Sequence, residues 1–318
     1  MTDRPRCNIA ASVRQRLLNL AKARQEDFQR ILMQYALERL LYRLSLSVHA
    51  NRFTLKGALL FLLWMQEPHR RTKDLDLLGT CDPAPSRLAE IFGELCALPV
   101  EDDGLVFVSD TISAKPIRED NLHGGVRIRM NAFLGTVRIP LQIDIGFGDV
   151  VTPPARRVSF PALLDFPGPQ LFAYAQETAI AEKLSAIVTL DIDNSRMKDF
   201  YDLWTLGNSF AYDGAQLREA IAATFDRRNL PGPAESPVGL TDAFARDQRK
   251  QTQWKAFLRQ SVGTENQELP LAEVVSFLAV FLLPVLRAIS AEAVFMGRWD
   301  PRGPWRMEFR SPSYMAAV

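Results

Sequence analysis

The sequence has few cysteines and almost no net charge, and both shortages exclude classes of protein. The cysteines are Cys7, Cys81 and Cys96, an odd number without CxxC spacing. They predict neither a disulfide framework nor a zinc site, and they point to a reducing compartment. The formal net charge is only +1 over 318 residues. No overall field therefore marks a nucleic-acid-binding protein, and any such site has to be a local patch.

Long hydrophobic runs are also missing. The most hydrophobic segment, residues 274–286, lies between Glu273 and Arg287 and contains a proline. A membrane-spanning helix takes about 20 apolar residues, so this segment predicts a buried helix instead. The charged residues 1–10 lack the apolar run of a signal peptide. The sequence therefore predicts a cytoplasmic protein with no membrane partner.

Several common catalytic motifs do not occur. There is no GxxxxGK[ST] phosphate loop, no HExxH zinc motif and no GxSxG around a serine. Phosphate-loop NTPases, zinc proteases of the HExxH kind and serine hydrolases with a nucleophile elbow are thereby excluded.

The most informative stretch present is residues 53–78. It predicts a strand, a turn at Lys56-Gly57, an apolar helix from Ala58, a basic loop and a second strand. In the second strand Asp74 and Asp76 alternate with leucines, so both carboxylates point to one face. Two such neighbours repel each other unless a positive charge lies between them.

A third carboxylate occupies a similar position further on. The strand predicted after the Gly135-Thr136 turn carries Asp144 on its polar face. Carboxylate oxygens are the ligands that Mg²⁺, or Mn²⁺, takes together with substrate phosphates. Asp74, Asp76 and Asp144 are therefore candidate metal ligands for phosphoryl transfer. The alternative is that Asp74 and Asp76 are the solvent-facing side of an amphipathic strand.

The turn before these carboxylates suits a phosphate group. Backbone amides at the start of a helix favour anions, and Lys56 next to Gly57 adds a positive charge. Arg71 and Thr72 in the basic loop complete the candidate triphosphate-binding set. The pattern predicts a nucleoside triphosphate (NTP) and metal site.

A second cluster of charges lies in the helical part of the chain. Lys183 lies on one predicted helix, and Asp199 and Asp202 share a face of the next. A helical hairpin brings Lys183 toward these aspartates. The lysine could neutralise phosphate charge, or it could form an ion pair that fixes the hairpin.

The chain divides into a mixed first part and a helical second part. Two helices, broken at residues 24–26, precede the sheet, and the basic residues between their apolar positions, including Arg39 and Arg43, are expected on a solvated face. A proline-rich linker over residues 151–169 follows the strands. The predicted domains are 1–165 and 166–318. Arginines near Trp299 and Trp305 either grip single-stranded nucleic acid or belong to a tail that packs back.

Five blocks, in order, give the chain a family resemblance: ALERLLYRLSLS, FTLKGALLF, RRTKDLDLLG, LQIDIGFGD and ETAIAEKLSAIV with NSRMKDFYDLW. Over roughly residues 10–290 they resemble the AbiEii/AbiGii toxins, which are nucleotidyltransferase-fold toxins of abortive-infection and toxin–antitoxin systems. The resemblance implies an α+β fold, with an N-terminal nucleotidyltransferase-like mixed sheet flanked by helices and a mainly helical C-terminal lobe.

The resemblance also implies roles for particular residues. The first family motif falls on Lys56, Gly57, Asp74 and Asp76, and later motifs fall on Lys183, Asp199 and Asp202. Related nucleotidyltransferases often have serine after the glycine, where this chain has Ala58. Triphosphate binding would therefore depend on backbone amides and Lys56.

The resulting hypothesis is a magnesium-dependent nucleotidyltransferase toxin with a cognate antitoxin. Asp74 and Asp76 hold the metal, while Lys56, Gly57, Arg71, Thr72 and Lys183 hold the NTP. Asp202 or Asp199 orients or deprotonates the acceptor hydroxyl. Similar toxins transfer nucleotides to the 3′ end of tRNA, so this end is the expected acceptor. Two alternatives are nucleotide transfer to a protein hydroxyl and a non-catalytic module that binds NTP or the antitoxin.

Overall fold

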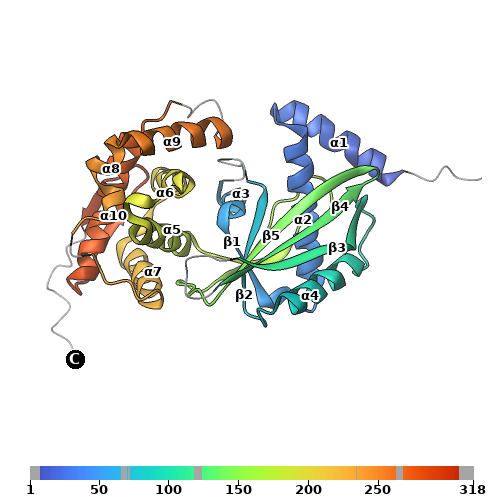
Figure 1. The fold of residues 1–318 in the computed structure, drawn as a ribbon, viewed down its shortest axis with the longest axis horizontal. Helices are drawn as coiled ribbons and strands as arrows, with labels where there is room; N and C mark the ends of the chain where they lie inside the picture. The colour runs from blue at the N-terminus through green and yellow to red at the C-terminus, as the bar shows by residue number, and fades with distance from the viewer. Residues whose placement is uncertain are drawn as a thin grey trace, which may run out of the picture. The chain divides into compact units, whose positions relative to one another are not determined.

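The structure, a computed structural model, describes residues 8–65, 70, 72–117, 124–233, 235–262 and 268–307 (Figure 1). The chain forms two compact units, and each is described by itself. The first unit spans Met1–Pro68, Thr72–Asp149 and Ala155–Tyr174, and the second spans His69–Arg71, Val150–Pro154 and Ala175–Val318.

The first unit begins with the two predicted helices. These are α1 (Ile9–Arg24) and α2 (Phe28–Leu46), and the break between them is confirmed. Gln25 ends α1 in the left-handed conformation, and the Asp27 side chain accepts a hydrogen bond from the backbone of Arg30 to start α2. The break is thus specified locally.

A seven-stranded mixed sheet forms the core of this unit, which confirms the predicted fold class. Its strand order is β3-β4-β5-β2-β1-β7-β6, with parallel β1–β7 and β2–β5 pairs and antiparallel pairing elsewhere. The strands are β1 (Phe53–Lys56), β2 (Asp74–Gly79), β3 (Leu105–Ile117), β4 (Gly125–Leu134), β5 (Val137–Phe147), β6 (Arg156–Ser159) and β7 (Gln170–Ala173).

The two faces of the sheet differ in polarity because side chains alternate along each strand. Leu75, Leu77, Ile143 and Ile145 are buried on one face, where α2 and α4 (Pro85–Ala97) pack against the strands. The opposite face carries the aspartates of β2 and β5.

Two arginines expected on a solvated face are buried instead. Arg39 and Arg43 on α2 both donate hydrogen bonds to the Asp103 carboxylate, at 2.9 and 2.7 Å. These cations hold the pKa of Asp103 below its usual range, although burial by itself would raise it. The helical spacing of apolar residues could not predict these ion pairs, because Asp103 lies some 60 residues away in sequence.

The proline-rich passage and the four residues after it contain two strands that the sequence did not predict. β7 pairs with β1, and β6 pairs with β7 as an edge strand. The sheet therefore continues past residue 165, where the sequence suggested a domain boundary. Prolines at 161, 167 and 169 lie between the two strands, where no ladder hydrogen bond is needed.

The second unit is mainly helical. Its helices are α5 (Gln176–Leu190), α6 (Met197–Ser209), α7 (Gly214–Arg227), α8 (Asp242–Arg246), α9 (Gln248–Ser261) and α10 (Leu271–Ser290). α5 contacts α6 and α7, and α10 contacts α6, α7 and α8.

The described chain of both units also contains four short 3₁₀ turns. They are η1 (Ala50–Arg52), η2 (Gly57–Leu59), η3 (Asp191–Asp193) and η4 (Val238–Leu240).

One helix of the described chain, α10, is long and apolar enough to cross a membrane by length and composition alone. Here one stripe of it, including Leu278 and Phe281, is buried among the helices of the second unit, while Val280 on another side is 51% exposed. The buried helix expected over residues 274–286 is therefore buried along one stripe.

The C-terminal tail packs back on the second unit. β9 (Gly297–Trp299) joins β8 (Tyr212–Asp213) and β10 (Trp305–Met307) in a small sheet. Trp299 is fully buried, and Trp305 stacks on Phe281. Of the two interpretations of these tryptophans, the structure shows the packed tail.

Gly207 lets α6 pack closely against α10. This glycine lies inside α6, which continues to Ser209. A Cβ at Gly207 would lie 2.8 Å from the Phe277 ring. The Gly207 carbonyl accepts hydrogen bonds from the Trp299 indole and from the backbone N–H of Arg302. The glycine therefore permits close packing inside the helix.

Gly207→Ala is expected to lower the free energy of unfolding by about 1–3 kcal/mol, because the methyl group overpacks the site. Gly93→Ala is the matched control, since Gly93 lies inside α4 with nothing within 4 Å of its added Cβ. That change should raise stability by up to about 1 kcal/mol. Urea unfolding of both variants measures the difference, and equal effects would contradict the packing argument.

Candidate functional site

Four charged side chains form a row across the polar face of the first unit. Strand register places Lys56 of β1 opposite Asp76 of β2, Asp76 opposite Asp144 of β5, and Asp144 opposite Arg127 of β4. Opposed residues on neighbouring strands point to the same face. The two carboxylates thus lie between two cations, which reduces the repulsion that the sequence alone left unexplained.

Gly57 fits against the Asp76 carboxylate. Its φ of +74° is a conformation that glycine adopts without strain. A Cβ at this position would lie 2.0 Å from Asp76 Oδ2. The turn therefore requires glycine both for its backbone conformation and for room beside the carboxylate.

The segment after Gly57 differs from the prediction. The chain makes the 3₁₀ turn η2, and the α-helix α3 (Leu60–Met65) begins two residues after the expected Ala58. A short 3₁₀ turn does not align amides as a longer α-helix does. A phosphate bound here would depend mainly on Lys56 and on the backbone of the turn.

Lys56 is oriented by an aspartate that the sequence did not single out. Its ammonium donates a hydrogen bond to Asp149 Oδ2 at 2.7 Å and lies 5.8 Å from the centre of the Tyr174 ring. Both Lys56 and Asp149 remain partly accessible. The ammonium is therefore held beside Asp76 without being sealed from solvent.

Asp144 is engaged by Arg127. The guanidinium donates to both carboxylate oxygens, at 2.8 and 2.7 Å. This hydrogen bond, with the charges of Asp144, Asp74 and Asp76, raises the pKa of Arg127. Arg127 takes one lone pair of each Asp144 oxygen and places a positive charge beside them, and the role of Asp144 as a third ligand stays a prediction.

The residues partly fit a divalent cation. Asp74 and Asp76 are two apart on β2 and share a face, and a Mg²⁺ ion can be held by two carboxylates with substrate phosphates and water. Within the described ranges, however, no cluster of three or more His, Cys, Asp or Glu side chains is placed to hold a metal ion. The geometry therefore suits a cation that binds together with a nucleotide.

The rest of the basic loop is described only in part. The Thr72 hydroxyl approaches the Asp74 carbonyl at 3.4 Å, a long hydrogen bond. Arg71, predicted to bind the triphosphate, lies outside the described residues. Arg70, which the sequence did not single out, takes part in the second cluster.

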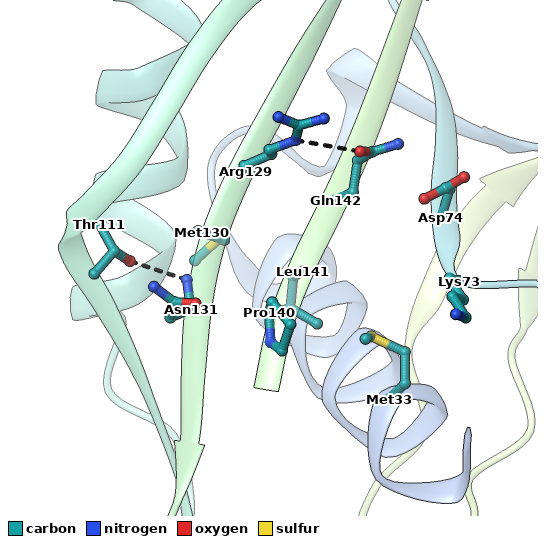
Figure 2. A pocket seen from close by; sticks show the side chains of 10 residues that line it. All are labelled: Met33, Lys73, Asp74, Thr111, Arg129, Met130, Asn131, Pro140, Leu141 and Gln142. Atoms are coloured by element: carbon teal, nitrogen blue, oxygen red, sulfur yellow. Dashed lines mark hydrogen bonds between the residues drawn. The ribbon is translucent and has the colours of Figure 1, made fainter. Parts of the chain in front are cut away.

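A cleft of about 370 Å³ opens from Asp74. Figure 2 shows it between β2 and the strands β5, β4 and β3, with Met33 of α2 projecting from below. Arg129 donates a hydrogen bond to the Gln142 side chain at 3.3 Å, and the backbone N–H of Asn131 donates one to Thr111 Oγ1 at 2.9 Å. All the residues that line it belong to the first unit.

The second cluster lies in the other unit and is an ion-pair network. Lys183 donates to Asp202 at 2.6 Å and to Asp199 at 3.2 Å. Arg70 binds both oxygens of Asp202, and Arg196 binds Asp199 at 2.6 Å. The two carboxylates are fully buried. The hairpin ion pair is therefore present as one of the two alternatives left open.

The charge balance of this network keeps Lys183 and Asp199 ionised. Burial by itself would lower the pKa of Lys183, but Asp202 and Asp199 raise it above its usual range. Burial would likewise raise the pKa of Asp199, but Lys183 and Arg196 lower it. Each carboxylate accepts hydrogen bonds from two cations, and these make it a weaker base toward a substrate proton.

A comparison with protein families decides the affiliation. The family described as "Nucleotidyl transferase AbiEii toxin, Type IV TA system" matches residues 39–279. The chain belongs to this family. It is thus a toxin nucleotidyltransferase of a type IV toxin–antitoxin system, which implies an antitoxin partner, and the predicted family is confirmed.

Two solved structures are similar to this chain. MenT4, a nucleotidyltransferase toxin from Mycobacterium tuberculosis, superposes with a TM-score of 0.54 at 22% identity, over 88% of this chain and 93% of its own. JHP933 from Helicobacter pylori gives 0.47 at 13% identity, over 84% and 95% of the two chains. Among curated proteins, none matches the sequence. The likeness to MenT4 supports the nucleotidyltransferase fold of this AbiEii-family chain.

Proposed function

We propose that this AbiEii-family toxin transfers a nucleoside monophosphate from an NTP to an acceptor, and that the acceptor is the 3′ end of a tRNA. The acceptor hydroxyl oxygen bonds to the α-phosphorus while the bond from that phosphorus to the β-bridging oxygen breaks. Pyrophosphate leaves, and the hydroxyl proton passes to a carboxylate or to water. A tRNA modified at this end would no longer support translation.

The observation that carries the proposal is the row of Lys56, Asp76, Asp144 and Arg127, with Gly57 packed against Asp76. In it, carboxylates able to hold a cation lie next to a lysine able to hold phosphate. Phosphoryl transfer asks a protein mainly for such positioning and charge neutralisation. In a member of a nucleotidyltransferase family, this arrangement favours catalysis over an ordinary amphipathic strand.

Asp74 and Asp76 would hold the cation, Mg²⁺ or Mn²⁺, in this proposal. Such a cation neutralises phosphate charge and lowers the pKa of a bound hydroxyl group. Lys56 would turn from Asp149 to the triphosphate, and Gly57 would keep its backbone open to it. Arg71, Thr72 and Lys183 keep their predicted roles in NTP binding, and Asp202 keeps its predicted role toward the acceptor.

Labelling identifies both the nucleotide and the acceptor. Cell extract is incubated with the protein, a divalent cation and each α-³²P-labelled NTP in turn, and the products are then treated with RNase or protease. We expect label from one preferred NTP in a band of tRNA size that RNase removes. Leaving out the cation should abolish the signal.

The other functions predict different products. Label that protease removes would indicate transfer to a protein hydroxyl. NTP binding without any labelled product would indicate a non-catalytic binding module, an outcome made plausible by the absence of a serine hydroxyl at Ala58. Either result would refute the tRNA proposal.

A further inference from the structure

We infer that the cleft beside Asp74 binds the terminal nucleotide of the acceptor strand, with its sugar hydroxyl toward Asp74. The inference rests on the proposed function, because it names the acceptor subsite of the same reaction. It assigns Arg129 and Lys73 to the acceptor phosphate and Asn131 and Gln142 to the base.

The cleft exists because two neighbouring strands start at different levels. β5 begins at Val137, but its pairing with β2 begins only at Gln142, opposite Asp74. Before that point the edge of β5 that faces β2 has no ladder partner in the described chain. Such an edge exposes backbone N–H and C=O groups, apart from the missing N–H of Pro140. Figure 2 shows Pro140, Leu141 and Gln142 of β5 at this place, with Met33 of α2 below them.

The direction of phosphoryl transfer selects the ligand. In an in-line displacement the attacking and leaving oxygens lie on opposite sides of the phosphorus. Lys56 and Gly57 lie on the β1 side of β2, and the cleft lies on the β5 side. If the pyrophosphate end is held near Lys56, the attacking hydroxyl has to arrive across Asp74, from the cleft.

The chemistry of the lining matches a nucleotide. Arg129 and Lys73 provide positive charge for a phosphate, and Met33 and Pro140 provide an apolar surface for a base. The amides of Asn131 and Gln142 offer donors and acceptors for a base edge. A volume of about 370 Å³ lies in the range of small-ligand pockets.

A binding assay tests the inference without any catalysis. The probe is a 5′-fluorescent RNA pentanucleotide that ends in CCA with a free 3′ hydroxyl, and binding is followed by anisotropy. Arg129→Gln is expected to raise its Kd by about 10-fold or more, while the Kd for NTP stays unchanged. Arg52→Gln is the matched control, because Arg52 is an exposed arginine of the same unit that does not line the cleft.

Cross-linking provides a second measurement that does not depend on a variant. A pentanucleotide with 4-thiouridine at its 3′ end should cross-link, on irradiation, to peptides containing Met33, Met130 or residues 139–142. Cross-links confined to other peptides would overturn the assignment. So would equal RNA binding by Arg129→Gln and the wild type, or Arg129-dependent binding of a serine-containing pentapeptide in place of RNA.

The two proposals fail in different ways. Arg129-dependent RNA binding without labelled product would refute the proposed transfer and leave the cleft as an RNA-end site. Labelled tRNA with unchanged acceptor KM in Arg129→Gln would keep the proposed function and refute the cleft as the acceptor subsite.

Discussion

Asp76→Asn is expected to reduce nucleotide transfer by at least about 100- to 1000-fold, the usual cost of removing one group that stabilises transition-state charge. Asparagine keeps the shape of the side chain beside Gly57 but removes the negative charge opposite Lys56 and Asp144. A cation would lose one of its two ligands, and Asp74→Asn should have a similar effect. Initial rates of label transfer to tRNA measure the loss.

The control for Asp76→Asn is Glu90→Gln, the same change of charge at an exposed position of helix α4. It should leave transfer unchanged, and the urea midpoints of both variants should match the wild type. Gly57→Ala makes a complementary test, because its methyl group would overlap Asp76 Oδ2 in a strained backbone conformation. We expect it to impair transfer although no charge is lost. Wild-type transfer by Asp76→Asn would remove the row of charges from the mechanism.

The sequence revealed the parts of this site that depend on local geometry. The alternation of Asp74 and Asp76 with leucines was enough to place both carboxylates on one face, since neighbouring side chains of a strand alternate. The Lys56-Gly57 turn was likewise a local signal. Its contact with Asp76 was not, because it joins two strands separated by a helix and a loop.

Arg127 was missed although the sequence held a signal for it. The Gly135-Thr136 turn joins Leu134 to Val137, which are paired. Counting seven residues outward from each side leads to Arg127 and Asp144, so the hairpin register alone predicts their pairing. The same counting would have shown that Asp144 has a guanidinium partner.

Asp149 and Arg70 had no comparable signal. Asp149 follows the end of β5, and its contact with Lys56 joins positions 93 apart. Arg70 contacts Asp202 across 132 positions. Such pairs depend on how loops close over a finished fold, which hydrophobic periodicity does not encode. The short strands β6 and β7 escaped notice for a related reason, because four residues between prolines carry little periodicity.

Asp199→Asn is expected to lower the free energy of unfolding by about 3–5 kcal/mol, the usual cost of breaking a buried ion pair. The change leaves Lys183 with Asp202 alone and deprives Arg196 of its 2.6 Å contact. Asp226→Asn is the matched control, because Asp226 is exposed on α7 of the same unit. Urea unfolding near pH 7 measures both variants.

The pH dependence of stability separates the ion pair from other causes. Since the folded pKa of Asp199 is lowered, its contribution is present above the ordinary carboxyl pKa of about 4 and is lost as the pH falls through the folded value. The raised pKa of Lys183 affects the alkaline limb of the stability curve. Its contribution is present below the ordinary lysine pKa of about 10.4 and is lost as the pH rises through the folded value. Asp199→Asn should therefore flatten the acid limb of the stability curve relative to wild type.

The same variant weighs structure against catalysis for this cluster. If the carboxylate only stabilises the hairpin, its neutralisation makes the protein less stable, and each molecule that remains folded keeps its transfer rate. If the carboxylate receives the acceptor proton, its neutralisation reduces the transfer rate even of molecules that stay folded. Transfer rates normalised to the folded fraction, measured at low urea and near neutral pH, distinguish the two. Because Asp199 already accepts hydrogen bonds from two cations, we expect the first result, with stability reduced and normalised transfer within about threefold of wild type.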